Sequence, residues 1–337
     1  MRKSGYDLCR VIACLSVVAG HTMMLFWDFD PGRPLWAVYN FLMITARYSV
    51  PVFFMIPGAL MLERRTLNFR RHMRRTGHLL VLFYCWSAIC RIVDACCGHV
   101  WMDGEPLALL ILQGYFHLWF LPALAMCYCA IPLLHGLIHG DTENIRRGTL
   151  LLCGIVLVLF TFEAEPDKPL WLVSLLTPYK LEHFFYVLYM LLGWVLSKQS
   201  LSKRQQTGLG LTALALCLIV AWLNRRAAIR AGQALDAYFG EFVISAAVTA
   251  TFFFTLCQRL ESAAAKHGAL LQKLSDSSLG VYLMHPIFID LLRGSGLELR
   301  AYSAAWLYPL CLAAFVLLPL GITLVLQKLP YAKKLVS

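Results

Sequence analysis

Long apolar segments recur along this chain, and this feature constrains its fold more than any other. Each of ten segments holds roughly 16 to 27 residues, close to the length that a helix needs to cross a bilayer. Backbone polar groups in lipid must be satisfied within the segment, and these runs are far longer than barrel strands, so we expect helices. The segments are residues 6–27, 36–62, 76–97, 117–138, 148–163, 181–197, 207–224, 237–257, 277–292 and 304–327.

The composition agrees with this interpretation. Hydrophobic residues make up 59% of the chain and charged residues only 15%, which excludes an ordinary soluble enzyme of this length. No linker rich in Gly, Ser or Pro divides the 337 residues. We therefore predict an all-α polytopic integral membrane bundle of about ten transmembrane helices, forming a single domain over residues 1–337.

The net charge of +11 could suggest a nucleic-acid partner, but the positions of the basic residues point elsewhere. Lysines and arginines concentrate in alternate loops, as the positive-inside rule requires. We therefore predict that both termini are cytosolic, that membrane lipids are partners and that nucleic acid is not. The loop 225–236 departs from this pattern, because its three arginines fall on the predicted outer side.

The first apolar segment contains two ionisable side chains, Arg10 and His21, eleven residues apart. At about 100° per residue, eleven steps close three turns with roughly 20° left over, so both lie on one helix face about 16 Å apart along the axis. Asp7 and Cys14 share that stripe. Ionisable groups at membrane depth usually line a pathway or a reaction centre. In the alternative interpretation, Asp7 and Arg10 form a structural pair and His21 is merely hydrogen-bonded.

The second segment is interrupted by residues that bend helices. Pro51, Pro57 and Gly58 should break or kink it, and such features are tolerated in a membrane where neighbouring helices, side chains or water satisfy the freed carbonyls. Asn40 and Arg47 precede this region. We expect both to face the same polar cavity between helices.

Two further histidines lie beside aromatic residues. His117 and Trp119 mark the start of the fourth span; the tryptophan suits an interfacial anchor, and the histidine could hydrogen-bond a substrate or help to carry a proton. Tyr282 and His285 lie on adjacent turns of the ninth span. For His285, packing against a carbonyl freed by the following proline and a role in the site remain equally open.

A run of arginines follows the second span, at residues 65–75. Arg71, Arg74 and Arg75 have helical spacing, and Arg70 lies on the adjacent flank. Such a cluster suits phosphates. It could hold anionic lipid headgroups and set the topology, or it could bind the phosphates of a cytosolic coenzyme.

Five of these patterns occur together, in the order seen in the membrane acyltransferase family 3, which this chain resembles over nearly its whole length. Each motif is weak alone, but five in register over ten spans make a specific signal. They are the Arg10 and His21 pair, VPVFFMIPGAL at 50–60, the arginine run, HLWFLPAL at 117–124 and SLGVYLMHP at 278–286.

The resemblance implies a single membrane acyltransferase domain that moves an acyl group from cytosolic acyl-CoA, with acetyl-CoA as the expected donor, to a hydroxyl of an envelope polysaccharide or lipid-linked sugar. It implies a bacterial inner-membrane location. By analogy, His21 would be the essential histidine and Arg10 would engage the donor. Arg71 and Arg74, with Arg70 beside them, would lie where the family's cytosolic arginines bind the donor.

The chain departs from the family at one turn. Where the family usually has Ser-Gly-Tyr after FFMI, this chain has Pro57, Gly58 and Ala59. The missing hydroxyls argue against a catalytic role for that turn and could alter acceptor choice. No zinc-like spacing occurs among the twelve cysteines, so we expect no metal.

The residues leave three functional classes open. An acyltransferase could use His21 as a general base or as a transient acyl carrier. A transporter or flippase would use the buried charges to line a permeation path, although the two halves show no convincing inverted repeat. A structural partner of a glycan assembly complex would use them only to hold helices together.

Overall fold

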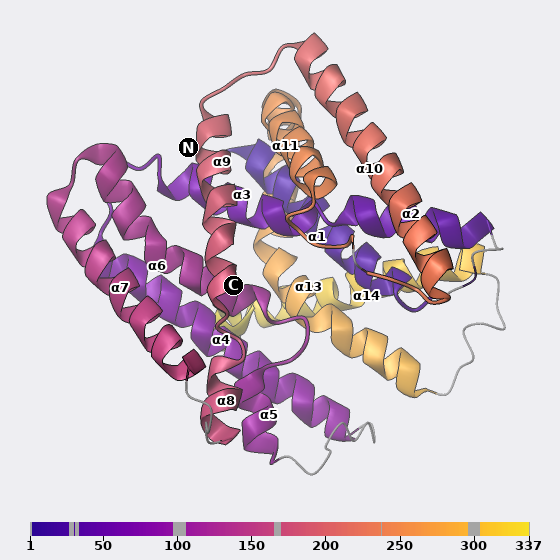
Figure 1. Ribbon diagram of the computed structural model, residues 1–337, viewed down its shortest axis with the longest axis horizontal. Helices are drawn as coiled ribbons and strands as arrows, with labels where there is room; N and C mark the ends of the chain where they lie inside the picture. Colours follow the sequence, from indigo (N-terminus) through magenta and orange to yellow (C-terminus); the bar gives the residue numbers. More distant parts are fainter. Residues whose placement is uncertain are drawn as a thin grey trace. The chain divides into compact units, whose positions relative to one another are not determined.

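The computed structural model describes residues 2–26, 30, 34–96, 106–164, 170–236, 238–295 and 304–336. Over these ranges the chain forms helices and turns without any strand (Figure 1). Within these ranges, five helical stretches are long and apolar enough to cross a membrane. The all-helical fold agrees with the prediction, whereas ten spans and cytosolic termini stay predictions. The five are Leu35–Met61, Phe69–Cys96, Phe120–His139, Lys203–Ala231 and Trp306–Leu326.

The chain divides into two compact units. Unit 1 comprises Met1–Ile56 and Val195–Ser337, and unit 2 comprises Pro57–Trp194. The boundaries fall inside α3 (Ser49–Met61) and α9 (Val187–Ser197). Each unit therefore contributes part of these two helices.

In unit 1 a single helix lies at the centre of the packing. This helix, α1, packs against five other helices of unit 1, and most of those helices pack against fewer helices than α1 does. It begins at Ser4 because the backbone N–H groups of Ser4 and Gly5 donate to the Glu261 carboxylate over 2.9 and 2.6 Å, and a helix start favours such an acceptor. The helices are α1 (Ser4–Met23), α2 (Pro34–Ala46), α10 (Lys203–Ala231), α11 (Ile244–Arg259), α12 (Glu261–Ala265), α13 (Gly268–Gly294), α14 (Ala304–Leu326) and η3 (Ala332–Leu335).

The two ends of the chain approach each other within unit 1. The Arg2 guanidinium donates to the Asp276 carboxylate over 2.8 Å, and the Gln327 amide, just after α14, donates to the Asp276 backbone carbonyl over 3.1 Å. The start of α1 and the end of α14 are therefore at the same end of the unit. This arrangement is compatible with termini on one side of a membrane.

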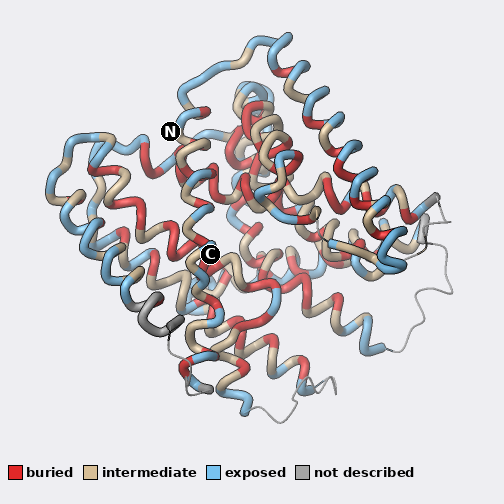
Figure 2. The backbone as a smooth tube through the Cα atoms, in the orientation of Figure 1, coloured by how far each residue is buried: buried red, intermediate tan, exposed pale blue. Residues whose placement is uncertain are grey.

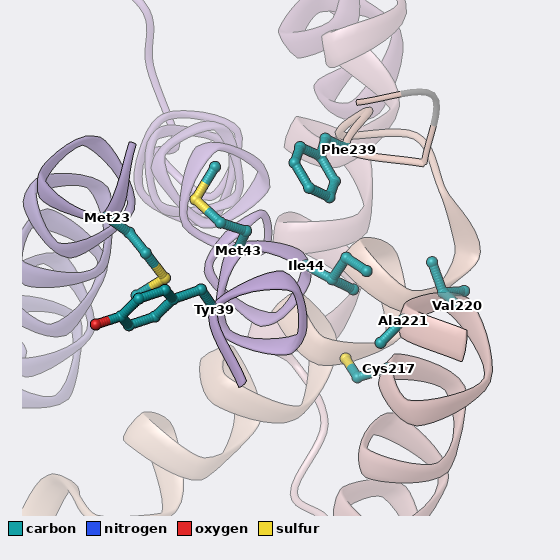
Figure 3. Close-up of a cluster of buried hydrophobic side chains, with 8 residues drawn as sticks. All are labelled: Met23, Tyr39, Met43, Ile44, Cys217, Val220, Ala221 and Phe239. Atoms are coloured by element: carbon teal, nitrogen blue, oxygen red, sulfur yellow. The ribbon is translucent and has the colours of Figure 1, made fainter. Parts of the chain in front are cut away.

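A buried apolar cluster fixes the other end of α1 (Figure 3). Its side chains come from α1, α2, α10 and the segment after α10, and Met23, two residues beyond His21, is the member that α1 contributes. The cluster therefore restrains the turn that carries this histidine. Its members are Met23, Tyr39, Met43, Ile44, Cys217, Val220, Ala221 and Phe239.

Helix α10 extends further than the sequence predicted. The prediction of a loop over 225–236 is wrong, because α10 continues to Ala231 and includes the three arginines. The stretch RRAAIRA contains no helix breaker and is rich in strong helix formers, and Gly232, at φ 67°, ends the helix in the left-handed region. The Ser202 and Gln205 side chains form a capping box at its start.

The outer surface of α10 is apolar. Buried and exposed residues alternate along α10 (Figure 2). Large hydrophobic side chains are among the exposed ones. A helix with apolar residues all round suits lipid better than water. The exposed large hydrophobic side chains of α10 are Leu211, Leu214, Leu218, Ile219, Trp222, Leu223 and Ile229.

The second predicted span is interrupted, at a different place from the one the prolines suggested. The helix breaks at Arg47 and Tyr48, between α2 and α3. Pro51 is the third residue of α3, where a missing N–H removes no intrahelical bond. Pro57 lies inside α3 without ending it. The break therefore places Arg47 at a helix interruption.

Unit 2 is built around α6. This helix packs against α4, α7 and the 3-10 helix η1, while α5 packs against α4 and α8. The predicted span 181–197 begins with η1 and continues as α9. The bounds are α4 (Phe69–Cys96), α5 (Leu107–Gln113), α6 (Phe120–His139), α7 (Thr142–Ala164), α8 (Leu170–Leu176) and η1 (Leu181–Tyr186).

One glycine at the end of α3 is required by packing. A Cβ on Gly58 would overlap the Met190 backbone carbonyl of α9. Glycine permits the close approach of the two helices, as small residues do at membrane helix contacts. The helix contact therefore requires a glycine at position 58.

Candidate active site

Helices α1 and α13 meet along a polar seam. The Arg10 guanidinium donates to the Ser275 hydroxyl over 2.8 Å, the Cys14 thiol donates to the Ser278 carbonyl over 3.4 Å, and His21 Nδ1 lies 2.7 Å from His285 Nε2. The partners are 264 or 265 residues apart in every pair, so the two helices run parallel and in register. The face of α1 shared by Arg10, Cys14 and His21 is therefore the one toward α13.

The two histidines form the most specialised contact of this seam. Their rings are nearly coplanar, with an angle of 11° between planes and centroids 5.0 Å apart. His285 is fully buried, and its Nδ1 lies 3.1 Å from the Val281 carbonyl. Pro286 frees the carbonyl of Tyr282, so His285 bonds a different carbonyl from the one the sequence suggested and contacts His21 as well.

The other end of the seam is a charged network. The buried Asp7 carboxylate accepts two hydrogen bonds from Arg2, of 2.6 and 2.7 Å, and lies 3.5 Å from the Arg10 guanidinium. The hydrogen bond to Asp7 raises the pKa of Arg2 above its ordinary value. Asp7 thus pairs primarily with Arg2, and Arg10 is oriented by Ser275 together with the Asp7 charge.

Arg47 and Tyr282 lie around the histidine end of the seam. The Tyr282 ring centroid is 6.2 Å from that of His285. The Arg47 guanidinium is 3.9 Å from the Glu241 carboxylate and 5.2 Å from the centre of the Phe239 ring. Arg47 also interacts electrostatically with His21. The Arg47 cation is therefore paired with Glu241 and Phe239.

Asn40 occupies a structural position within unit 1. Its amide donates to the Ala221 carbonyl over 2.9 Å, and its carbonyl accepts from the Asn224 amide over 2.7 Å. Both asparagines are buried. These bonds join α2 to α10, so the structure gives Asn40 a role in helix packing, and the substrate contact predicted for it stays a prediction.

The arginine run lies in unit 2 at the start of α4. Arg70, Arg71 and Arg74 are all exposed, and the Asn68 side chain caps the helix by accepting from the Arg71 backbone N–H over 2.9 Å. Exposed guanidinium groups at the positive end of a helix lack the stabilisation that an acidic residue would have there. The charges at this helix start suit a phosphate group.

Histidines of α6 hold the segment that precedes these arginines. His135 Nε2 bonds the Arg64 carbonyl over 2.8 Å, and His139 Nε2 bonds the Leu62 carbonyl over 2.9 Å. The position of the arginine run is therefore set by backbone contacts rather than by its own side chains. These contacts could not be predicted from the sequence, because they join residues 71 and 77 positions apart.

His117 and Trp119 lie in the turn before α6, also in unit 2. His117 is buried beside Tyr115, with ring centroids 5.6 Å apart. Trp119 stacks on His183 at 5.8 Å and lies 5.8 Å from Tyr186. The aromatic ring contacts explain the shape of this turn, and the substrate roles predicted for both residues stay predictions.

A family model described as the acyltransferase domain, family 3, matches residues 3–325. The chain belongs to acyltransferase family 3. Together with its long apolar helices, the family match indicates a multi-pass membrane protein. The matched range includes the whole α1–α13 seam and the arginine run.

The chain is also similar to a curated protein, the serine/alanine racemase of Enterococcus gallinarum. The two are 25% identical over 310 residues, which cover 86% of this chain and 41% of the racemase. The chain thus spans about two fifths of the length of that relative. No solved structure matches the acyltransferase.

The sequence did not identify the partners of the predicted site residues in this acyltransferase. Ser275 and Val281 act through an ordinary hydroxyl and a backbone carbonyl, which leave no distinctive pattern. Glu261 was indistinguishable from other loop acids. Across the ranges that the structure describes, no three His, Cys, Asp or Glu side chains gather in an arrangement that could hold a metal ion.

Proposed function

We propose that this acyltransferase moves an acetyl group from cytosolic acetyl-CoA to a hydroxyl of an envelope polysaccharide or lipid-linked sugar in the bacterial inner membrane. The observation that carries the proposal is the α1–α13 seam, in which a hydrogen-bonded histidine pair and an arginine lie on one face of a membrane helix. Membership of acyltransferase family 3 supports a catalytic role for the histidine pair in acyl transfer.

His21 acts as the general base in this proposal. Its imidazole takes the proton of the acceptor hydroxyl while the hydroxyl oxygen forms a bond to the thioester carbonyl carbon. The carbon–sulfur bond then breaks, and the protonated imidazole returns the proton to the departing thiolate. The ester, the free thiol and neutral His21 are the products. Transient acylation of His21, followed by transfer, is the alternative route.

Cations near His21 suit this chemistry. Negative charge develops on the carbonyl oxygen as the acceptor attacks, and a positioned cation stabilises it. Arg47 interacts electrostatically with His21, which supports such a role. Arg10, which Ser275 holds on the same face, engages the donor in this proposal.

The exposed arginines of unit 2 fit the phosphates of the donor. Arg70, Arg71 and Arg74 offer guanidinium groups that form paired hydrogen bonds with phosphate oxygens. Binding of lipid headgroups by the same arginines is the competing role. A donor role predicts that replacing them weakens acetyl-CoA binding even when the protein is in neutral detergent.

The acceptor class rests on resemblance. In length and motif spacing the chain resembles the inner-membrane O-acetyltransferase that modifies enterobacterial common antigen, including the stretch LRGSGLEL at 292–299. Of this stretch, residues 296–299 lie outside the described part of the chain. We propose an envelope glycan or its lipid-linked precursor as the acceptor on this basis.

Labelled acetyl-CoA tests the function directly. Membranes containing this chain should transfer the acetyl label to glycan or glycolipid, and membranes with His21→Ala should not. His267→Ala, which changes an exposed histidine of the same unit, is the matched control and should retain transfer. Movement of a labelled solute without covalent change would instead support the transporter interpretation.

A further inference from the structure

His285 is connected to the candidate base by a chain of hydrogen bonds. His285 Nδ1 lies 3.1 Å from the Val281 carbonyl, and His285 Nε2 lies 2.7 Å from His21 Nδ1. His285 and Val281 are both buried. These hydrogen bonds therefore connect the backbone of α13, through the His285 side chain, to the His21 side chain of α1.

The hydrogen-bonding chemistry gives this chain a direction. A carbonyl can only accept, so His285 Nδ1 carries the proton that it donates to Val281. A neutral imidazole has one N–H, and because burial of an uncompensated charge is costly, a neutral ring is expected here. His285 Nε2 is then the acceptor, and His21 Nδ1 must be the donor. His21 Nε2 is left as the nitrogen that carries the lone pair.

The geometry of the two rings supports this assignment. The 2.7 Å between His21 Nδ1 and His285 Nε2 and the 5.0 Å between ring centroids put both nitrogens on the line that joins the ring centres. With 11° between the ring planes, the rings therefore lie edge to edge rather than face to face. The N–H of one ring then points at the in-plane lone pair of the other, which is the direction that hydrogen bonds prefer. The His21 ring is therefore fixed in both orientation and tautomer.

We infer that His285 is a positioning residue that holds His21 in the Nδ1–H tautomer, so that Nε2 is the nitrogen that acts on the acceptor hydroxyl. The inference rests on the proposed function for its catalytic consequence, but the tautomer itself is a property of the structure. A second group that fixes a catalytic imidazole is a recurring device in acyl-transfer enzymes. In this protein the second group is the His285 imidazole, which is itself hydrogen-bonded to the Val281 carbonyl.

Two substitutions at the same position test the inference. His285→Leu removes the acceptor for the His21 N–H while keeping an apolar side chain in a buried site. His285→Gln restores an acceptor, because its amide oxygen can take the hydrogen bond. We expect His285→Leu to lower kcat roughly 10- to 100-fold with KM for acetyl-CoA little changed, and His285→Gln to recover a substantial part of the loss.

The controls separate positioning from folding. Activities are expressed per molecule of monodisperse protein, and the double variant His21→Ala/His285→Leu should be no less active than His21→Ala alone, because the residues act as a unit. A kcat for His285→Leu equal to that of the unaltered protein would overturn the inference. Equal kcat values for the leucine and glutamine variants would overturn it too.

A spectroscopic readout keeps the inference distinct from the proposed function. Nitrogen NMR of protein labelled with [15N]histidine should show His21 protonated on Nδ1, and this signature should be lost in His285→Leu and kept in His285→Gln. Protonation of His21 on Nε2 in the unaltered protein contradicts the inference. The expected spectra without any acyl transfer would refute the proposed function and leave the tautomer assignment intact.

Discussion

Asp7 offers the sharpest test of how the charged end of the seam is stabilised. Its side chain is 5% exposed, and it accepts two short hydrogen bonds from Arg2, which itself is 41% exposed. Arg2 also pairs with Asp276, whose side chain is 50% exposed. One arginine therefore binds one buried and one solvated carboxylate, and the two can be compared by the same substitution.

The expected magnitudes differ because of solvent. Asp7→Asn keeps the shape but loses the charge and turns one acceptor into a donor facing the guanidinium. A hydrogen bond to a charged group contributes about 1.5–3 kcal/mol, and the exposed part of Arg2 regains water, so we expect a loss of about 2 kcal/mol. Asp276→Asn removes an exposed pair worth about 0–1 kcal/mol.

Equilibrium unfolding in mixed detergent micelles measures both variants on the same scale. The account predicts that Asp7→Asn lowers the free energy of unfolding several times more than Asp276→Asn does. Equal losses for the two variants would refute the reasoning that burial of Asp7 sets its contribution. So would an Asp7→Asn protein as stable as the unaltered one.

Two further predictions concern unit 2. Gly58→Leu should prevent stable folding, because its side chain would meet a backbone carbonyl of α9. Gly77→Leu in α4, where a Cβ meets nothing within 4 Å, should fold normally by size-exclusion chromatography. Two equally well-folded variants would contradict the packing argument. Replacing Arg71 and Arg74 together by Gln should raise KM for acetyl-CoA about tenfold or more with little change in kcat, because phosphate contacts are lost. Arg146→Gln, which changes an arginine already paired with Glu143, should leave KM unchanged. Similar KM values for the two proteins would argue that Arg71 and Arg74 bind lipid instead.

The fold class could be predicted from the sequence because burial in a membrane requires long apolar segments. Apolar segments of spanning length predict helices whatever their neighbours, and the long helices of both units bear this out. Helix ends were harder to predict. The arginines at 225–230 suggested a loop by charge, but helix propensity prevailed and α10 continues to its terminal glycine.

The candidate site was predictable along one helix and not across helices. Helical periodicity alone places Arg10 and His21 on one face. The partner face on α13 is about 264 residues away, and neither the serine at 275 nor the carbonyl of Val281 differs in sequence from many others. The contact between His21 and His285 depends on the parallel register of two helices, which only the tertiary structure supplies.

Single-turnover acetyl transfer by the His21→Ala protein measures the contribution of the His21 imidazole to the reaction. The variant, purified in detergent alongside the His267→Ala control, is mixed with labelled acetyl-CoA and an envelope glycan fraction, and labelled ester is followed with time. General-base catalysis contributes about 10² to 10⁴ in rate, so the account predicts a rate at least about a hundredfold below the control with folding retained. Transfer at the control rate would contradict it.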